Sequence, residues 1–233
     1  IAKNQGLVFI STPLDINSAK FLSTIVDAIK ISSGDNNFVQ LLRTVSKINK
    51  PLILSSGLMN LNQIIQSVNI IQNSSKKIKN KDELAILHCV TSYPVDPRDA
   101  NLRAIQTLSN AFDYTIGYSD HTLPDENMTA LTTAYLLGAR VIEKHFTLSQ
   151  KMYGSDAMNS TEPEEFKNLV DEIRKVEIVL SNDIDKDEKV KSLGEMKMTF
   201  EKSIVSSGSL KKSDIISFDD LSFKKPGNGI PAR

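Results

Sequence analysis

Residues 114–145 read YTIGYSDHTLPDENMTALTTAYLLGARVIEKH, and this segment establishes the kind of fold to expect. Two short apolar runs, Tyr114–Tyr118 and Val141–His145, flank a segment whose apolar residues have helical spacing, Asn127–Leu137. Both runs lead into ionisable side chains, namely Ser119-Asp120-His121 and Glu143-Lys144-His145. The pattern predicts a strand–helix–strand unit that carries polar side chains at its strand ends.

The same alternation extends along most of the chain. The apolar runs are mostly uninterrupted, which is typical of parallel strands buried on both faces. Segments with helical spacing lie between them, and Asn60 is a candidate N-cap for one of these helices. Such regular alternation indicates an α/β fold with a parallel sheet. The other predicted strands are Leu7–Ser11, Ala28–Ile31, Leu52–Ser55 and Leu84–Cys89, and the other predicted helices are Phe38–Ile48, Leu61–Ile71, Arg98–Leu108 and Pro163–Leu180.

Polar clusters at the strand ends distinguish between two kinds of parallel sheet. An open doubly wound sheet concentrates its chemistry at one crevice, whereas a TIM (β/α)8 barrel gathers residues from many strand ends around one mouth. Six successive strands end in small polar or ionisable residues here, which favours the barrel. Six is two short of closure, so residues 1–180 are expected to be a barrel without its first two strands. We therefore expect no activity from residues 1–233 alone.

The composition changes after residue 180. Residues 181–202 are charged and poor in large apolar side chains, which predicts a linker. Short strands are expected at Ser203–Val205, Leu210–Phe218 and Leu221–Phe223. They are too few to bury a core alone, so residues 203–233 are expected to be the start of a truncated small domain. The chain begins without methionine and ends in a turn-rich segment, as expected for a fragment.

The overall composition argues against several classes of protein. The 28 basic and 28 acidic residues cancel, so there is no net field to hold nucleic acid or an anionic membrane. A single cysteine, Cys89, excludes an internal disulfide framework and suits a reducing compartment. No apolar run reaches the roughly 18 residues of a membrane helix, and no signal peptide is present. A cytoplasmic globular protein is the expectation.

Two histidines are the first candidates for chemistry. His121 and His145 end consecutive predicted strands, so a barrel would bring them to the same mouth. Two neutral imidazoles suit a divalent transition metal that keeps positions open for water and substrate. Asp120 or Glu143 could orient an imidazole from behind. The alternative is that the two histidines are unrelated.

A second group of residues could hold an anion. Lys30 ends an apolar strand, where burial without an anionic partner is costly. The turn at Ser33 offers hydroxyl and N–H donors of the kind that bind phosphate or carboxylate, and Thr12 and Ser119 could add donors. The alternative is a lysine that extends to solvent beside an ordinary turn.

Other polar residues give weaker signals. Thr91, Tyr93 and Asp156 lie in predicted loops over the barrel mouth, and on spacing alone we interpret them as simple loop residues. His88 lies within an apolar strand and is interpreted as a core residue or one that supports the site. Nothing in the sequence around Cys89 indicates an activated nucleophile.

Seven segments of the chain form an ordered set of motifs. They are FISTP from Phe9, IKISSGDNN from Ile29, PLILSSG from Pro51, LHCVTSYP from Leu87, IGYSDHT from Ile116, VIEKHFTL from Val141 and KKPGNGIP from Lys224. In this unbroken order they resemble the sialic acid synthase family, which includes N-acetylneuraminate, legionaminate, pseudaminate and spore-coat polysaccharide synthases. The resemblance runs to the end of the chain and would start at the third barrel strand.

The resemblance implies a TIM barrel followed by a small antifreeze-like (SAF) domain, in a domain-swapped homodimer. It implies condensation of phosphoenolpyruvate with an N-acetylated amino sugar, such as N-acetylmannosamine or a 2,4-diacetamido sugar, to give a nonulosonic acid and phosphate. The catalytic residues it implies are Lys30, His121 and His145. Both histidines match the family's metal ligands, usually for manganese, with magnesium or cobalt as alternatives. Phosphoenolpyruvate-binding positions match Thr12, Lys30, Ser33 and Ser119, and sugar-facing positions match Asp35, Tyr93 and Asp156.

Three departures from the family pattern limit this transfer. Thr91 stands where the N-acetylneuraminate enzymes have Asn, Asp35 replaces the more usual Glu, and Lys225 replaces an Arg that binds the partner subunit's substrate. The exact sugar therefore stays open. Another phosphoenolpyruvate-dependent synthase, of octulosonate or heptulosonate phosphates, and a barrel subunit without turnover are the alternatives.

Overall fold

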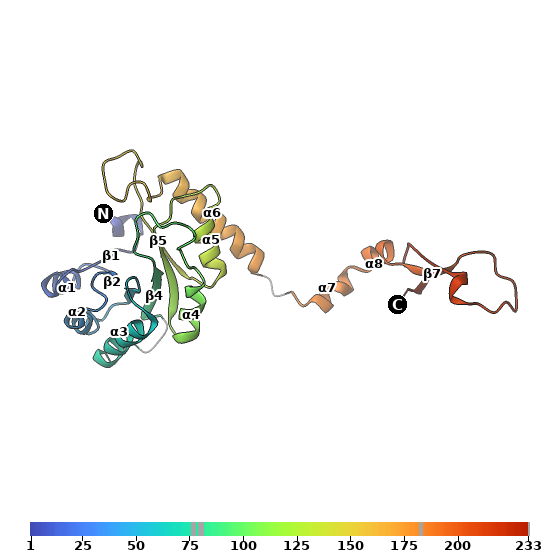
Figure 1. Cartoon of the computed structure of the whole chain (residues 1–233), viewed down its shortest axis with the longest axis horizontal. Helices are drawn as coiled ribbons and strands as arrows, with labels where there is room; N and C mark the ends of the chain where they lie inside the picture. The colour runs from blue at the N-terminus through green and yellow to red at the C-terminus, as the bar shows by residue number, and fades with distance from the viewer. Residues whose placement is uncertain (76–77, 79–81, 182–183, 233) are drawn as a thin grey trace. The chain divides into compact units, whose positions relative to one another are not determined.

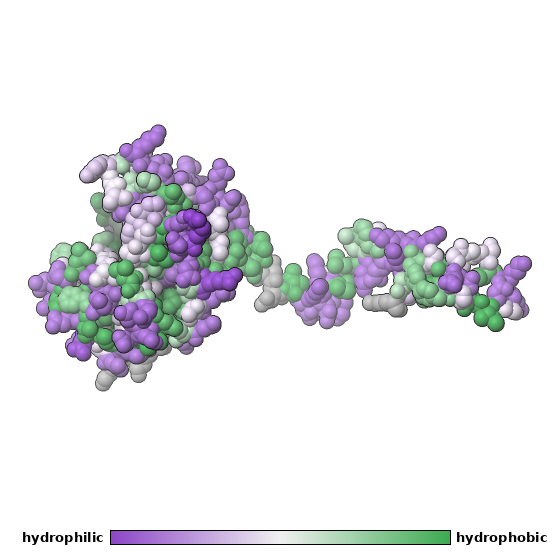
Figure 2. Space-filling model, in the orientation of Figure 1, coloured by the Kyte–Doolittle hydropathy of each residue, from purple (hydrophilic) through white to green (hydrophobic). Residues whose placement is uncertain are grey.

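The computed structural model describes residues 1–75, 78, 82–181 and 184–232. The contacts divide the chain into two compact units, Ile1–Val179 and Leu180–Arg233, and each is described by itself (Figure 1). In the described residues, no helix combines the length and apolar character needed to cross a membrane. On the face in view in Figure 2, hydrophilic and hydrophobic residues of the first unit are intermixed.

The first unit is built on six parallel strands whose order in the sheet equals their order in the sequence. No reversal of strand order occurs, so the sheet is of the barrel type and not of the open doubly wound type. Right-handed crossovers between parallel strands place the connecting helices on one face. Figure 1 shows these helices around the strands. The strands are β1 (Ile10–Ser11), β2 (Ala28–Ile31), β3 (Leu52–Ser55), β4 (Leu84–Cys89), β5 (Thr115–Asp120) and β6 (Val141–Lys144).

Six helices accompany the strands, preceded by a 3-10 turn, η1 (Ala2–Gln5). Their apolar faces pack on the sheet, and fully buried residues such as Ile29, Leu54 and Ile86 form the core between the two layers. The predicted N-cap Asn60 is confirmed, because its side chain accepts from the backbone N–H of Gln63. The helices are α1 (Ile16–Leu22), α2 (Val39–Val45), α3 (Leu61–Ser74), α4 (Ala104–Ala111), α5 (Thr129–Leu136) and α6 (Pro163–Leu180).

Some predicted boundaries are wrong, for local reasons. The strand predicted at Leu7–Ser11 is reduced to Ile10–Ser11, since this edge strand pairs only with β2. The helix predicted from Arg98 begins at Ala104, because Asn101 adopts φ 46°, a left-handed conformation that a helix does not allow. Helix α1 was not predicted; Asp15 caps it by accepting from two backbone N–H groups.

The second unit contains helices and a small antiparallel sheet. Residues 181–202, predicted to be a linker, contain α7 (Lys186–Ser192) and α8 (Gly194–Phe200). The strands β7 (Ser203–Ser206), β8 (Leu221–Lys224) and β9 (Ile230–Pro231) pair in the order β8-β7-β9. The strand predicted at Leu210–Phe218 is absent, and this region forms turns followed by a 3-10 helix, η2 (Phe218–Asp220).

Candidate active site

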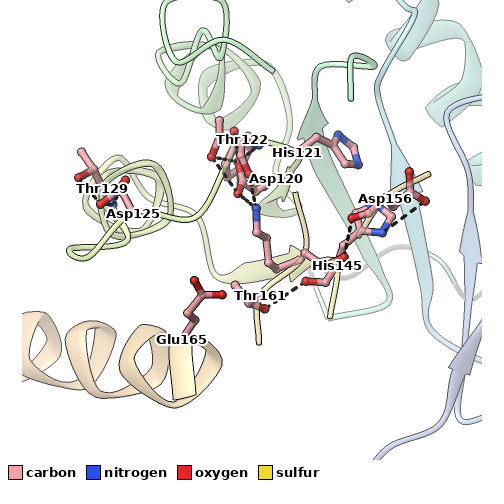
Figure 3. Close-up of polar contacts among 12 residues, drawn as sticks. Asp120, His121, Thr122, Asp125, Thr129, His145, Asp156, Thr161 and Glu165 are labelled. Carbon is pink, nitrogen blue, oxygen red and sulfur yellow. Dashed lines mark hydrogen bonds and ion pairs between the residues drawn. The ribbon is translucent and has the colours of Figure 1, made fainter. Parts of the chain in front are cut away.

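The two histidines lie together at the carboxyl ends of β5 and β6. The centres of the His121 and His145 rings are 5.2 Å apart, and the rings are tilted by 49° (Figure 3). His121 is buried, with 4% of its surface exposed, and His145 is half-buried. The predicted placement at one mouth is therefore confirmed, because neighbouring parallel strands end at the same edge of the sheet.

One contact at the ring and one at the backbone hold His121 in place. Its Nδ1 lies 3.0 Å from the carbonyl oxygen of Val90, so Nδ1 donates a hydrogen bond there and Nε2 is the ring nitrogen left for another partner. The backbone N–H of Val95 donates to the carbonyl of His121. Burial lowers the pKa of His121, but hydrogen bonds to Cys89 and Val90 outweigh this and leave the pKa raised. Val90, and not a carboxylate, orients this imidazole.

Loop residues surround His145. Its Nδ1 is 3.9 Å from Oδ2 of Asp156, and its carbonyl accepts a 2.8 Å hydrogen bond from the N–H of Thr161 (Figure 3). The ring of Tyr93 has its centre 4.3 Å from that of His121 and 6.1 Å from that of His145. Burial and the proximity of His121 lower the pKa of His145, which keeps it neutral near pH 7. Tyr93 and Asp156, interpreted from spacing as simple loop residues, thus lie at the histidine pair.

The donor set at this mouth fits a divalent cation with open positions. Two imidazole nitrogens on adjacent strand ends are suitable ligands for a first-row transition metal. Within the described ranges, no group of three or more His, Cys, Asp or Glu side chains is placed to hold a metal. The described residues therefore offer two imidazole ligands at this mouth.

Lys30 meets a carboxylate inside the curved sheet. Its Nζ lies 2.8 Å from Oε1 of Glu143, and the Ser119 hydroxyl donates to the same oxygen at 2.6 Å. The Lys30 side chain is 16% exposed. The suggestion that Glu143 orients an imidazole is thus wrong. Glu143 is the anionic partner of Lys30, and two of the four predicted anion-binding residues, Lys30 and Ser119, converge on it.

A second set of hydroxyls lies nearby on β3 and its neighbours. The hydroxyl of Ser33 is 2.8 Å from that of Ser55 and 3.5 Å from Sγ of Cys89. A Cβ on Gly57 would lie 2.4 Å from the Ser33 hydroxyl and 2.5 Å from the Thr91 hydroxyl, so only glycine allows these two groups to converge. Burial raises the pKa of Cys89, but hydrogen bonds from His121, Ser33 and Ser55 lower it to about 7.

Three further predicted residues lie less centrally. Thr12 is half-buried just after β1, and its side chain makes no hydrogen bond within the described part of the chain. Asp35 accepts a 2.6 Å hydrogen bond from the Ser32 hydroxyl. Lys225 belongs to the second unit, where its Nζ is 4.9 Å from the centre of the Phe200 ring. The sugar-facing role of Asp35 and the substrate contact of Lys225 stay predictions.

His88 faces away from the histidine pair. Its Nε2 lies 2.8 Å from the Ala100 carbonyl, its ring stacks on Tyr118, and burial lowers its pKa. The interpretation of His88 as a core residue is confirmed. A cavity of about 490 Å³ lies beside it between the starts of α3 and α4, and Cys89, Val90 and Thr91 of the candidate site also line it.

The NeuB family model matches residues 1–185, which include both histidines, Lys30 and the loops at the mouth. The chain belongs to the NeuB family. It is 41% identical over 235 residues to an uncharacterized protein of Methanocaldococcus jannaschii, covering 100% of this chain and 66% of the relative. It is 37% identical over 234 residues to N,N'-diacetyllegionaminic acid synthase of Campylobacter jejuni, covering 99% and 67%.

A solved structure of a sialic acid synthetase is also similar to this chain. The N-acetylneuraminic acid (sialic acid) synthetase of Leptospira borgpetersenii matches with a TM-score of 0.73 and 30% identity, over 84% of this chain and 67% of that one. The chain therefore spans about two thirds of the length of these relatives.

Proposed function

We propose that this NeuB-family chain forms the metal- and phosphoenolpyruvate-binding part of a nonulosonic acid synthase. The proposed reaction condenses phosphoenolpyruvate with an N-acetylated amino sugar and releases inorganic phosphate. The observation that carries the proposal is the convergence of the His121–His145 pair with Tyr93 and Asp156 at one mouth, next to the Lys30–Glu143–Ser119 cluster. The names of the Campylobacter and Leptospira relatives agree with it.

The proposed roles follow from the chemistry of each group. In the condensation, C3 of phosphoenolpyruvate bonds to the aldehyde carbon of the sugar, and the aldehyde oxygen takes a proton. Water then adds at C2, the bond from C2 to the phosphate oxygen breaks, and phosphate leaves. Lys30 supplies a cation, and Ser33, Ser119 and Thr12 supply hydroxyls, for the phosphate and carboxylate of phosphoenolpyruvate.

His121 and His145 are the proposed ligands of a divalent cation, with manganese preferred and magnesium or cobalt as alternatives. When bound, the cation would polarise the aldehyde of the acceptor and order water. The lowered pKa of His145 supports this role, because only neutral imidazoles bind metals. At His121 the Val90 carbonyl occupies Nδ1, so a metal would bind Nε2 and displace the proton that the raised pKa favours there.

The acceptor sugar and the assembly are also proposed by analogy with the family. Tyr93, Asp156 and Asp35, with Thr91 at the rim, would face an N-acetylated amino sugar. The second unit would be the start of an SAF domain, and Lys225 would reach the substrate of the partner subunit in a domain-swapped homodimer. The reaction would take place in the cytoplasm, where phosphoenolpyruvate is available.

Phosphate release tests the proposal. The full-length protein is incubated with phosphoenolpyruvate, Mn²⁺ and a panel of acceptors. The panel contains N-acetylated amino hexoses, including N-acetylmannosamine and 2,4-diacetamido sugars, and also arabinose and erythrose phosphates. We expect sugar-dependent phosphate release that stops with chelator and with His121→Ala. Release driven by arabinose or erythrose phosphates would indicate an octulosonate- or heptulosonate-type synthase instead. Absence of release with every acceptor would indicate a barrel subunit without turnover.

A further inference from the structure

We propose that a buried ion pair behind the two histidines, Asp120–Lys144, is the device that sets their separation. The inference rests on the proposed function, since it assigns positioning residues to the proposed metal site. Asp120 immediately precedes His121, and Lys144 immediately precedes His145. The pair therefore joins the two positions of the chain from which the site histidines project.

The pair is fully enclosed, and both charged groups make several hydrogen bonds. Nζ of Lys144 lies 2.6 Å from Oδ2 of Asp120 and 2.6 Å from the carbonyl oxygen of Thr122, and both charged side chains are 1% exposed. Oδ1 of Asp120 accepts from the Tyr118 hydroxyl at 2.8 Å. It also accepts from the N–H and hydroxyl of Thr122 at 3.1 and 2.9 Å (Figure 3). With so many partners, a buried charge pair has one preferred geometry.

The pair lies on the opposite face of the strands from the proposed phosphoenolpyruvate site. Ser119 pairs with Glu143 in the ladder, and Asp120 pairs with Lys144 one step later. Because successive side chains in a strand point to opposite faces, Asp120 and Lys144 point away from the side on which Ser119 and Glu143 meet Lys30. The two residues thus cannot touch a substrate bound there, and any effect they have on it acts through the histidines.

The pair also stands where backbone pairing between β5 and β6 stops. Asp120↔Lys144 is the last pair in their ladder, so the histidines that follow have no direct ladder contact with each other. Each is held by a different segment: Val95 donates to the His121 carbonyl, and Thr161 donates to the His145 carbonyl. The ion pair is the side-chain tie between these two separately held ends.

Filling the space between the two strand ends would not by itself require charged side chains. A buried ion pair is often no more stabilising than apolar residues of similar volume, but removing one partner is strongly destabilising. Charge is useful here because its hydrogen bonds specify one relative position of the strand ends. A changed separation would move Nε2 of both histidines relative to a metal ion bound between them. Metal affinity is expected to fall, because it also falls when other groups that orient metal ligands are removed.

Variants of the pair test the inference with and without metal. Asp120→Asn leaves a buried lysine without its counter-charge, and the double variant Asp120→Asn/Lys144→Met removes both charges so that folding is retained. Asp171→Asn is the matched control, since it breaks the 2.6 Å Lys167–Asp171 pair on α6, which is exposed. Folding is checked by circular dichroism and thermal unfolding in chelator.

Two readouts are used for each folded variant. A crystal structure of each metal-free protein gives the His121–His145 ring separation, and Mn²⁺ titration followed by electron paramagnetic resonance gives the dissociation constant. We expect a changed or heterogeneous ring separation and Mn²⁺ affinity lower by about tenfold or more in the pair variants. The control variant is expected to match the wild type.

A double variant that keeps the wild-type ring separation would overturn the inference, as would one that keeps Mn²⁺ affinity within twofold. If wild-type protein itself binds no Mn²⁺, the metal role under the proposed function fails, while the crystallographic comparison still decides whether the ion pair positions the histidines. Loss of thermal stability in the pair variants, with unchanged ring positions, would mean a purely structural role and would also overturn the inference.

Discussion

Lys30 on β2 and Glu143 on β6 form a 2.8 Å ion pair although three strands lie between them in the sheet. In a flat sheet four strand spacings of about 4.8 Å would separate these strands by roughly 19 Å, well beyond the reach of the two side chains. The contact therefore requires a strongly curved sheet, with its concave face toward the proposed phosphoenolpyruvate site. The ion pair links β2 and β6 across the concave face, so its two charged groups lie on that face.

Replacing Lys30 tests its role as the cation of the site. Lys30→Met keeps the aliphatic length but removes the charge that now pairs with Glu143. We expect the kcat/KM for phosphoenolpyruvate to fall by about 100-fold, as for the loss of one charge-stabilising donor. Lys167→Met, at an exposed pair on α6, is the control. An unchanged kcat/KM in Lys30→Met would show that Lys30 does not bind phosphoenolpyruvate.

Position 57 is expected to require glycine, because two hydroxyl groups lie where a side chain would begin. A Cβ there would meet the hydroxyls of Ser33 and Thr91 at 2.4 and 2.5 Å, whereas a Cβ on Gly34 would meet nothing closer than 3.9 Å. Gly57→Ala is expected to raise the KM for phosphoenolpyruvate about tenfold and to destabilise the fold by about 1–3 kcal/mol. Gly34→Ala should leave both unchanged. Equal effects of the two alanines on KM and thermal unfolding would contradict this.

Acid should weaken the first unit in part through His88. Burial lowers the pKa of His88 below its ordinary value of 6.5, so the folded protein resists protonation there. Above pH 6.5 the residue is neutral in both states and contributes no pH dependence. Below it the unfolded chain binds a proton that the folded chain does not, so stability falls as pH falls.

His88→Gln tests this contribution, because the amide can still donate to the Ala100 carbonyl without titrating. Urea unfolding at pH 7 and pH 5 should show a smaller loss of stability in the variant, by at most about 1.4 kcal/mol per pH unit. His145 also has a lowered pKa, so part of the acid sensitivity should persist. Identical losses in wild type and variant would refute a contribution from His88.

The sequence allowed much of the fold to be predicted. The bounds of β2, β3 and β4 match the predicted runs, since uninterrupted apolar residues between polar turns have few other conformations. The proximity of His121 and His145 could also be predicted, because they end consecutive parallel strands. Strand order alone predicts that residues at the ends of consecutive strands lie close together, although they are far apart in the sequence.

The partners of the charged residues could not be predicted. The pairing of Lys30 with Glu143 spans 113 residues and depends on the curvature of the sheet, which no local pattern encodes. Asp120 was considered as a group that orients a histidine, but it pairs with Lys144 on the opposite face. The alternation of side chains along β5 was the available signal, since it places Asp120 and Ser119 on different faces.

Manganese binding at the histidine pair is the most direct test of the central claim. Titration of the purified protein with Mn²⁺, followed by electron paramagnetic resonance, is carried out for wild type, His121→Ala, His145→Ala and the control His88→Gln. We predict one site in wild type and in His88→Gln, and affinity reduced at least about tenfold in each of the other two variants. Equal Mn²⁺ affinity in all four proteins would contradict a metal site formed by His121 and His145.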